Sequence, residues 1–370
     1  MFDIKNATEK LIKGCIIPAS NGVNMYTPDG QGNYDALWTR DFFYMVDDAS
    51  EMIPLGDIKN AIQYLIDNVR EDGWVPDRVS RYGTPYYTAG GDDFPASPNL
   101  DNGPFLCLVA VEYLKMIDED AALEQFLLWK KTLCAGLDCL PVDGNGMMAN
   151  FATPPHSPYG FTDTICKTGL LCFETLLLWK AKKAIIPWLE LAGEDAGRYK
   201  ADVASIEENF EKVFLMDNGT LRAGTAHCNQ TDVWAMCYAL SVDFPLTEKV
   251  RDGIIDWLAG NYDSITEAGQ LRHIPAGEYW EKTLVPVEKG TYQNGAFWAT
   301  PVRWFCDALR EREPELVTRT LKDVLDYFEK NGIFECVNGD YKKLDTYVAS
   351  ATAVYASCKK DAEIKAVLNL

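Results

Sequence analysis

Apolar residues recur along this chain with helical spacing almost throughout, and the strict alternation typical of β-strands is nearly absent. We mark about twelve helical segments, which fall into roughly six pairs. The second member of each pair is amphipathic, with Lys, Asp and Glu opposite an apolar stripe, as expected of a helix with one solvated face. Clear examples of such stripes are Ile58, Ile62, Leu65, Ile66 and Val69; Val203, Ile206, Phe210 and Val213; and Val317, Leu321, Val324, Leu325 and Phe328.

The first member of each pair is apolar on nearly every side, which is typical of a buried helix. Such segments include residues 105–111, 169–173, 234–240 and 349–355. Six buried helices that alternate with six half-exposed ones predict an all-α fold, an (α/α)6 barrel with inner and outer rings. The inner helices begin at intervals of roughly 50 to 70 residues, as in helical hairpins with long loops on one face. With 370 residues and 47% hydrophobic content, residues 1–370 can form a single such domain.

Polar and aromatic residues gather where the inner helices are expected to begin. The six segments are residues 38–41, 98–104, 159–163, 229–234, 292–298 and 344–347. In a barrel of hairpins they all open onto one face, so their side chains should surround a central funnel. Helix caps explain the Asp and Thr residues there, but not the Trp, Tyr and Phe beside them, and aromatic rings with carboxylates suit a carbohydrate. The candidate sugar-binding residues are Trp38, Arg40, Asp41, Asp101, Asn102, Phe161, Lys167, Asp232, Trp234, Gln293, Asn294, Trp298 and Tyr347.

The segment from Tyr34 to Asp41 is the most informative of these. The Arg40 guanidinium and the Asp41 carboxylate can both hydrogen-bond vicinal hydroxyls in a fixed geometry, and the Trp38 indole can cover an apolar sugar face. The structural alternative is a helix cap with an ion pair, because a carboxylate in the first turn also meets the positive end of the helix. The recurrence of similar clusters along the chain favours the sugar pocket.

Composition excludes several other classes of function. The net charge of −20 argues against nucleic acid and anionic membrane surfaces, whose phosphates would be repelled. The eleven cysteines are scattered and lack paired metal spacing, which suits a reducing compartment. No apolar run reaches the length of a membrane span, and the first residues carry no signal core, so we expect a cytoplasmic protein. No phosphate loop or dinucleotide fingerprint is present, and we expect neither cofactor nor metal.

Three segments resemble those of six-hairpin glycosidases, most closely glucoamylases, with echoes of trehalases and processing α-glucosidases. Residues 37–41 are similar to the glucoamylase Trp/Tyr-Thr-Arg-Asp segment that grips the sugar in the cleavage subsite. Residues 97–104 resemble that family's Arg-Pro-Gln-x-Asp-Gly-Pro turn, and residues 292–298 resemble the Asn-Gly-x-x-Trp turn of the trehalase relatives. The resemblance implies an exo-acting, inverting hydrolase that removes a terminal, α-glucoside-like sugar from an oligosaccharide or glycoside. The Glu-Glu pair that opens the fifth helix of glucoamylases is missing, which argues against starch as the substrate.

Inverting glycosidases use one carboxylic acid and one carboxylate base. The resemblance implies that Asp163 is the acid. A helix N-terminus and Lys167, four residues later, would both favour the charged form of Asp163, so burial or a second carboxylate would have to raise its pKa. The structural alternative is a helix cap that pairs with Lys167, and Asp101 is the alternative acid.

The resemblance also implies a glutamate base in the segment before the last inner helix, which is Glu335 here. It stands alone in the apolar run from Ile333 to Val337, and a carboxylate in such surroundings is rare without a partner or a task. The structural alternative is a strand-like loop edge with its glutamate in solvent. Glu288 is the alternative base.

Two other classes of function use similar folds. A sugar epimerase or isomerase needs histidines in the funnel, and His156, His227 and His273 all fall outside the segments at the inner-helix starts. A non-catalytic sugar-binding barrel would keep the aromatic residues but has no need of Glu335. Within the glycosidases, an α-rhamnosidase-like enzyme or another exo-hydrolase is equally compatible, because pocket walls and not the fold choose the sugar. The sugar, its linkage and the oligomeric state stay open.

Overall fold

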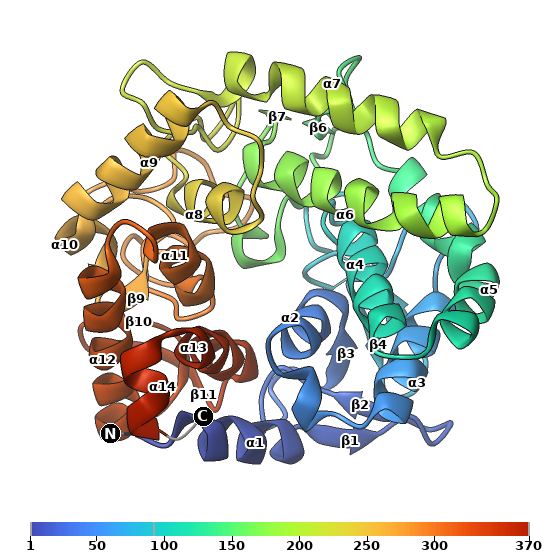
Figure 1. The fold of residues 1–370 in the computed structure, drawn as a ribbon, viewed down its shortest axis with the longest axis horizontal. Helices are drawn as coiled ribbons and strands as arrows, with labels where there is room; N and C mark the ends of the chain where they lie inside the picture. The colour runs from blue at the N-terminus through green and yellow to red at the C-terminus, as the bar shows by residue number, and fades with distance from the viewer. Residues whose placement is uncertain (1, 92, 369–370) are drawn as a thin grey trace.

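The computed structural model describes residues 2–91 and 93–368, and helices dominate this part of the chain. Within it, six helices contact one another in sequence order to form a closed ring around a central axis, with the last contacting the first (Figure 1). The helices of this inner ring are α2 (Thr39–Ala49), α4 (Asn102–Lys115), α6 (Cys172–Leu191), α8 (Val233–Ser241), α11 (Val302–Leu309) and α13 (Val348–Lys360).

Six further helices pack against the outside of this ring (Figure 1). They are α1 (Ile4–Gly14), α3 (Leu55–Ile66), α5 (Glu119–Asp138), α7 (Gly197–Phe214), α9 (Glu248–Gly260) and α12 (Pro314–Asn331). The short helices α10 (Tyr262–Ile265) and α14 (Ala362–Leu368) complete the set in the described residues. The first helix in the chain closes the outer ring by packing on the last inner helix, α13, so the two ends of the sequence lie side by side (Figure 1).

Burial explains why the two kinds of helix alternate. In α13 every residue from Val348 to Cys358 is buried, so its apolar and small side chains face neighbours on all sides. In α12 the buried apolar residues are the stripe from Val317 to Phe328 marked in the sequence, and the remaining side carries the charges. None of the helices in residues 2–91 and 93–368 is both long enough and apolar enough to cross a membrane.

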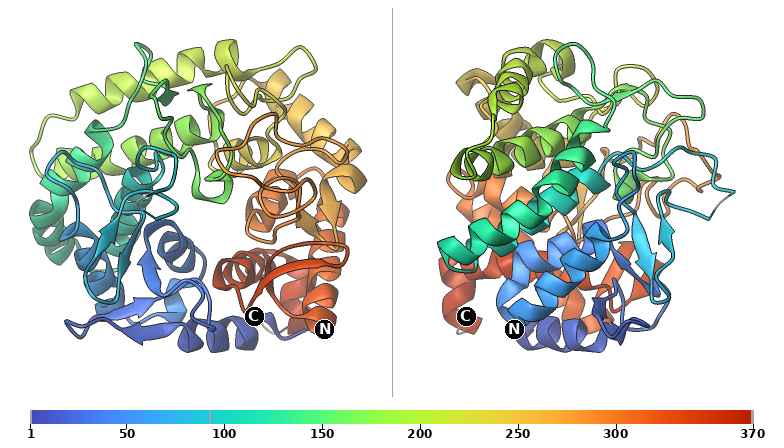
Figure 2. Two further views of the ribbon diagram at one scale, coloured as in Figure 1. Left: turned by 180° about the vertical axis from the view of Figure 1, so that it is seen from behind. Right: turned by 90° about the vertical axis from the view of Figure 1, so that its right-hand side faces the viewer.

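Eleven short strands form small antiparallel sheets between the helices of the described chain. They are β1 (Ile16–Pro18), β2 (Asn24–Tyr26), β3 (Ala36–Trp38), β4 (Arg78–Ser80), β5 (Pro85–Tyr86), β6 (Ala149–Asn150), β7 (Gly169–Leu170), β8 (Thr266–Glu267), β9 (Gln270–Leu271), β10 (Phe334–Asn338) and β11 (Tyr341–Asp345). At two to five residues they are too short to produce a visible alternation in the sequence. Seen from the side, the long connections gather at one end of the ring (Figure 2).

Two of these sheets position residues that matter below. The sheet β3–β4–β5 places Trp38 opposite Arg78, and Arg78 opposite Tyr86, in one row across three strands. The hairpin β10–β11 carries Glu335, which was expected in a loop. Backbone hydrogen bonds between Phe297 and Val337, of 2.7 and 2.8 Å, tie this hairpin to the segment before α11.

Two expectations about helix starts are wrong. Residues 160–162 form a 3-10 turn that ends at Asp163, whereas α6 begins only at Cys172. A left-handed glycine, Gly169, and the pairing of β7 with β6 interrupt the chain between them. The segment 292–298 likewise stops short of α11, which begins at Val302. Asp163 follows the 3-10 turn and is therefore not the N-cap of an α-helix.

Candidate active site

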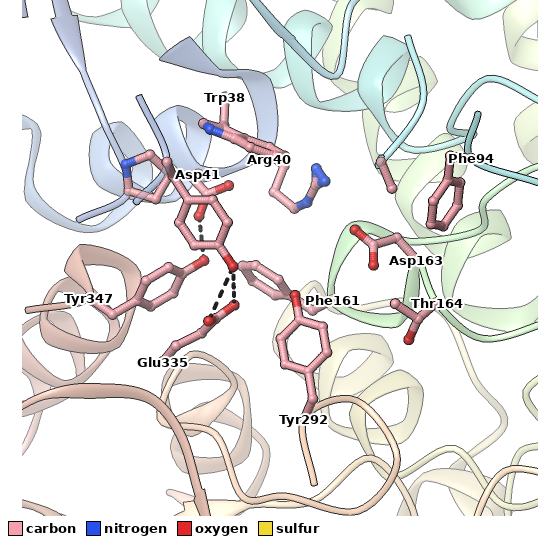
Figure 3. A pocket seen from close by; sticks show the side chains of 14 residues that line it. Trp38, Arg40, Asp41, Phe94, Phe161, Asp163, Thr164, Tyr292, Glu335 and Tyr347 are labelled. Carbon is pink, nitrogen blue, oxygen red and sulfur yellow. Dashed lines mark hydrogen bonds between the residues drawn. The ribbon is translucent and has the colours of Figure 1, made fainter. Parts of the chain in front are cut away.

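A cavity of about 160 Å³ lies between the first turn of α2 and the segments that precede α2, α4, α6, α11 and α13 (Figure 3). It is smaller than the roughly 300–1,000 Å³ pockets that take drug-sized ligands, and so suits a compact molecule. Of the residues singled out in the sequence, those that line it are Trp38, Arg40, Asp41, Phe161, Asp163, Glu335 and Tyr347. The other lining residues are Pro28, Tyr34, Ala89, Phe94, Gly160, Thr164 and Tyr292. None of them is among the candidate sugar-binding residues named from the sequence, although Tyr34, Gly160 and Tyr292 belong to the polar and aromatic segments described above.

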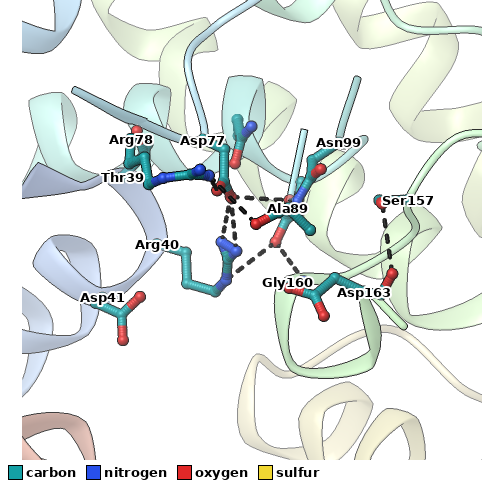
Figure 4. Close-up of polar contacts among 12 residues, drawn as sticks. Thr39, Arg40, Asp41, Asp77, Arg78, Ala89, Asn99, Ser157, Gly160 and Asp163 are labelled. Carbon is teal, nitrogen blue, oxygen red and sulfur yellow. Dashed lines mark hydrogen bonds and ion pairs between the residues drawn. The ribbon is translucent and has the colours of Figure 1, made fainter. Parts of the chain in front are cut away.

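Arg40 pairs with two buried carboxylates, those of Asp77 and Asp101 (Figure 4). Its two terminal nitrogens both donate to Asp77 Oδ1 at 2.8 Å, and its Nε lies 3.7 Å from Asp101 Oδ2. Asp101, expected to bind sugar or to act as the acid, is completely buried and outside the cavity lining. It is the second counter-ion of Arg40, and its carboxylate also accepts the Gly160 N–H at 2.8 Å.

Gly160 has to be glycine because the Arg40 guanidinium lies against its backbone. A Cβ at this position would stand 1.6 Å from Arg40 Nε, far inside van der Waals contact. The glycine thus lets the 3-10 turn cover the guanidinium directly and lets its N–H reach Asp101. This close approach links the turn that carries Asp163 to the start of α2.

Asp41 faces the cavity beside Arg40. Its Oδ1 accepts a 2.5 Å hydrogen bond from the Tyr347 hydroxyl, and both residues line the wall. Burial raises the pKa of Asp41 to about 6, although Arg40 and the Tyr347 hydroxyl act in the opposite direction. A hydroxylated ligand could replace part of the lost hydration of this carboxyl by donating hydrogen bonds to it.

Asp163 is oriented by one glutamine. The Thr164 N–H and hydroxyl both donate to Gln293 Oε1, at 2.8 and 2.6 Å. These two donors establish which end of the Gln293 amide is oxygen and which is nitrogen. The amide nitrogen of Gln293 then donates to Asp163 Oδ1 at 2.8 Å. Asp163 Oδ2 has no hydrogen-bond partner within the described residues, and the side chain lines the cavity. Burial raises the pKa of Asp163 to about 7, against the influence of Arg40, so this carboxyl holds a proton through much of the neutral range.

Glu335 lies across the cavity from Asp163 (Figure 3). Its two oxygens accept the Tyr34 hydroxyl at 3.1 and 3.2 Å, and its Oε2 is 3.8 Å from Lys343 Nζ. Burial raises its pKa to about 8; Lys343 and the Tyr34 hydroxyl favour the charged form, and Asp41 and Asp163 oppose it. The alternative base, Glu288, is exposed and outside the cavity lining.

These raised pKa values predict how stability depends on pH. The folded protein retains protons on Asp163 and Glu335 that the unfolded chain releases above its ordinary carboxyl pKa values of about 4. Their contribution is therefore complete below about pH 4 and is lost as pH rises through about 8. We expect the double variant Asp163→Asn/Glu335→Gln to gain stability relative to the parent between pH 5 and 9, by on the order of a few kcal/mol.

Urea unfolding of both proteins at pH 5, 7 and 9 measures this difference. The single variant Glu288→Gln is the control. Because Glu288 is exposed, the free energy of unfolding of this variant should match that of the parent at every pH. Parallel stability curves for the parent and the double variant would show that the two carboxyls titrate normally in the folded state.

The remaining predicted residues are buried behind the cavity wall rather than in it. Gln293 orients Asp163, as described, and Asn294 accepts the Trp280 N–H. Asp232 caps α8 by accepting the Ala235 N–H at 2.9 Å. Those that pack or pair inside the protein are Asn102, whose amide lies between Asp101 and the Asp77 N–H; Trp234, stacked on His273; and Trp298, against Phe161. Their position makes them supports of the wall and does not place them in contact with a ligand.

Lys167, a candidate sugar-binding residue, does not line the cavity, and the structural alternative in which it pairs with Asp163 is not realised either. Lys167 Nζ lies 2.8 Å from Glu174 on the first turn of α6, and 4.0 Å from Asp232. All three side chains are buried, so the ammonium neutralises charges that the core encloses. The turn after Asp163 directs Lys167 inward, where it forms no ion pair with Asp163.

None of the three histidines, all within the described residues, lines the cavity. His156 stacks on Trp74, His273 stacks on Trp234, and His227 is exposed beside Glu281. Residues 2–91 and 93–368 also contain no group of three or more His, Cys, Asp or Glu side chains arranged to hold a metal ion.

Comparison with known proteins identifies the fold. No protein-family model and no curated protein matches the sequence, but solved glycoside hydrolases match the structure. A GH63 mannosylglycerate hydrolase from Thermus thermophilus, in complex with Tris, superposes with a TM-score of 0.68 over 95% of this chain and 99% of that one, at 15% identity. The same hydrolase in complex with glucose gives 0.67, with the same coverage and 14% identity.

A rhamnosidase from Klebsiella oxytoca with rhamnose bound superposes with a TM-score of 0.66, covering 96% of this chain and 63% of that one, at 15% identity. At these identities the comparisons establish a shared fold. The chain thus shares the helical fold of these glycosidases.

Proposed function

We propose that this protein is an exo-acting, inverting glycoside hydrolase built on an (α/α)6 barrel, and that it removes one terminal sugar from a small glycoside or oligosaccharide. The observation that carries the proposal is the pair of buried carboxyls, Asp163 and Glu335, on opposite sides of a cavity of about 160 Å³. The small volume favours a single sugar ring, and hence an exo-acting enzyme. The glycosidase neighbours support the reaction class.

In the proposed reaction, Asp163 Oδ2 donates its proton to the glycosidic oxygen as the bond to the anomeric carbon breaks. Glu335 takes a proton from a water that attacks the same carbon from the opposite face, which inverts its configuration. The products are the free sugar and the free alcohol, and the two carboxyls return to their starting states by exchanging protons with solvent. A water between them requires the carboxyls to be roughly 6.5–9.5 Å apart.

The neighbouring side chains support these two roles. Glu335 has a hydroxyl, from Tyr34, and an ammonium, from Lys343, next to its oxygens, and both favour the carboxylate that a base needs. Burial outweighs them and leaves the pKa of Glu335, about 8, above that of Asp163, about 7, so the reactive form, with Asp163 protonated and Glu335 ionised, is a minor one at neutral pH. Asp163 has one oxygen held by Gln293 and the other directed to the cavity. We propose that Arg40 and Asp41 bind the hydroxyls of the sugar ring, while Trp38, Phe161 and Tyr347 cover its apolar faces.

The eleven cysteines are free in the structure, and nine of them are buried, with Cys134 and Cys139 half-buried. A chain with this many unpaired thiols is suited to a reducing environment. We propose on this ground that the enzyme works in the cytoplasm.

A panel of substrates tests the proposed reaction. It includes α-glucosides, mannosylglycerate and rhamnosides; the last two are suggested by the mannosylglycerate hydrolase and the rhamnose-bound rhamnosidase among the structural neighbours. We expect release of the terminal monosaccharide from at least one small glycoside. Binding of sugars without hydrolysis of any panel member would favour the non-catalytic alternative, and conversion of a free sugar without bond cleavage would favour an isomerase.

A further inference from the structure

Arg78 is a half-buried side chain near the cavity and has no part in the reaction proposed above. Its guanidinium carbon lies 4.7 Å from the ring centre of Trp38 and 4.4 Å from that of Tyr86, its neighbours in the row across β3, β4 and β5. Its side chain is 14% exposed, and Arg78 does not line the cavity. An arginine stacked between two rings keeps its N–H groups in a fixed plane.

These N–H groups hold one short stretch of backbone. Nη1 donates to the carbonyls of Thr88 and Ala89, at 2.9 and 3.2 Å, and Nη2 donates to the Gly90 carbonyl at 2.9 Å. Nη1 also donates to Asp77 Oδ2 at 3.0 Å (Figure 4). Because Asp77 Oδ1 binds Arg40, one carboxylate joins the arginine that lines the cavity to the arginine that holds residues 88–90.

The stretch held by Arg78 leads into the cavity wall. Ala89 and Phe94 line the cavity. The Phe94 ring packs directly on Gly90: a Cβ at residue 90 would lie 2.3 Å from the ring. Phe94 lies on the same side as Asp163 and Thr164 (Figure 3). Asp163 is the proposed acid, and the acid protonates the leaving group, so this wall borders the part of the cavity where the leaving group sits.

We propose that Arg78 is a positioning residue that fixes the leaving-group wall of the pocket, and thereby sets which leaving groups the enzyme accepts. The inference rests on the proposed function. The wall that Arg78 fixes is formed by Ala89 and Phe94, so it selects compact leaving groups that present an apolar face to the Phe94 ring. Arg78 acts through residues 88–90 and does not touch the substrate.

The test compares Arg78→Met with Arg78→Lys. Methionine keeps an apolar stem between the rings, and lysine keeps the charge beside Asp77, but neither can hold consecutive carbonyls in a planar fork. We expect both variants to raise KM at least tenfold for glycosides with a leaving group that contacts the wall, while kcat for an activated aryl-glycoside changes less than threefold. Phe94→Ala should give the same change of selectivity, and adding it to Arg78→Met should have little further effect.

Arg81→Met is the matched control, because Arg81 lies three residues further on, in the turn just after β4, and its side chain donates no hydrogen bond within the described residues. Equal losses for every leaving group, or the same selectivity in Arg78→Met as in Arg81→Met, would overturn the proposal. Hydrogen exchange at the amides of residues 88–91 gives a readout that needs no activity, and it should be at least tenfold faster in Arg78→Met. Unchanged exchange would show that Arg78 does not hold residues 88–90 and would overturn the proposal. Faster exchange in a protein that hydrolyses no glycoside would show instead that the proposed function is wrong.

Discussion

Glu335→Gln should lower kcat for every substrate by roughly 10²–10⁴-fold, because a glutamine cannot take the proton from the attacking water. Asp163→Asn should cause a loss of similar size on disaccharides and alkyl glycosides. The two variants should differ on activated aryl-glycosides, whose leaving groups need little protonation: these substrates should partly rescue Asp163→Asn and should not rescue Glu335→Gln. Initial rates on matched aryl and alkyl glycosides of the same sugar provide the comparison.

The controls follow from the position of the two carboxyls. Both are buried with raised pKa values, so their amide replacements should fold and lose none of the stability of the parent at neutral pH. Glu288→Gln and Asp101→Asn address the alternative base and acid. Full activity in Glu335→Gln together with a loss in Glu288→Gln would move the base to Glu288, and rescue of Asp101→Asn by aryl-glycosides would move the acid to Asp101.

Arg40→Ala should destabilise the protein by about 3–5 kcal/mol and abolish turnover, because it leaves buried Asp77 and Asp101 without their shared cation. Arg40→Lys keeps the charge and should restore part of the stability, but not the bidentate geometry, so its activity should stay low. Denaturant unfolding and kinetics on the same preparations measure both effects. Gly160→Ala should mimic the loss of activity, because its methyl group needs the space that the guanidinium occupies.

An exposed arginine with two carboxylate partners is the matched control. Arg312 lies 2.9 and 2.7 Å from Asp252 and Asp256 but is 40% exposed, so Arg312→Ala should cost no more than about 1 kcal/mol. If Arg40→Ala unfolds like Arg312→Ala and turns over substrate like the parent, Arg40 is only part of a helix start, and its role in the pocket is misassigned.

The helical periodicity was enough to predict the alternation of the two rings. A helix such as α13, built of small and apolar residues on all sides, can only be buried, and a stripe such as that of α12 can only face one way. The same local information predicted the pocket residues next to a helix start, Trp38, Arg40 and Asp41, because the helix itself directs them to the cavity.

Contacts between distant parts of the chain could not be predicted in this way. Lys167 lies four residues from Asp163, but the turn at Gly169 brings it to Glu174 and Asp232 instead. Asp77 is 37 positions from Arg40 and stands in no helix start, so nothing local marked it as the principal counter-ion. A second Arg-Asp neighbourhood, at Asp77 and Arg78, was the one signal available in the sequence.

The lining residues that were missed have the same explanation. Tyr34 was within the segment judged most informative, yet its hydroxyl pairs with Glu335, 301 positions away. Gln293 was selected as a sugar ligand, but its amide is already hydrogen-bonded to Thr164, Gly160 and Asp163. Residue type and position relative to a helix start identify the side chains near the funnel, but tertiary hydrogen bonds decide which of them have free polar groups.

The configuration of the sugar at the moment of release tests the central claim most directly. On the best α-glycoside of the panel, 1H NMR recorded before mutarotation should show the β-anomer of the free sugar appearing first, because water attacks from the Glu335 side, opposite the leaving group at Asp163. First appearance of the α-anomer would mean retention through a covalent intermediate, and would contradict the assignment of the two carboxyls as acid and base.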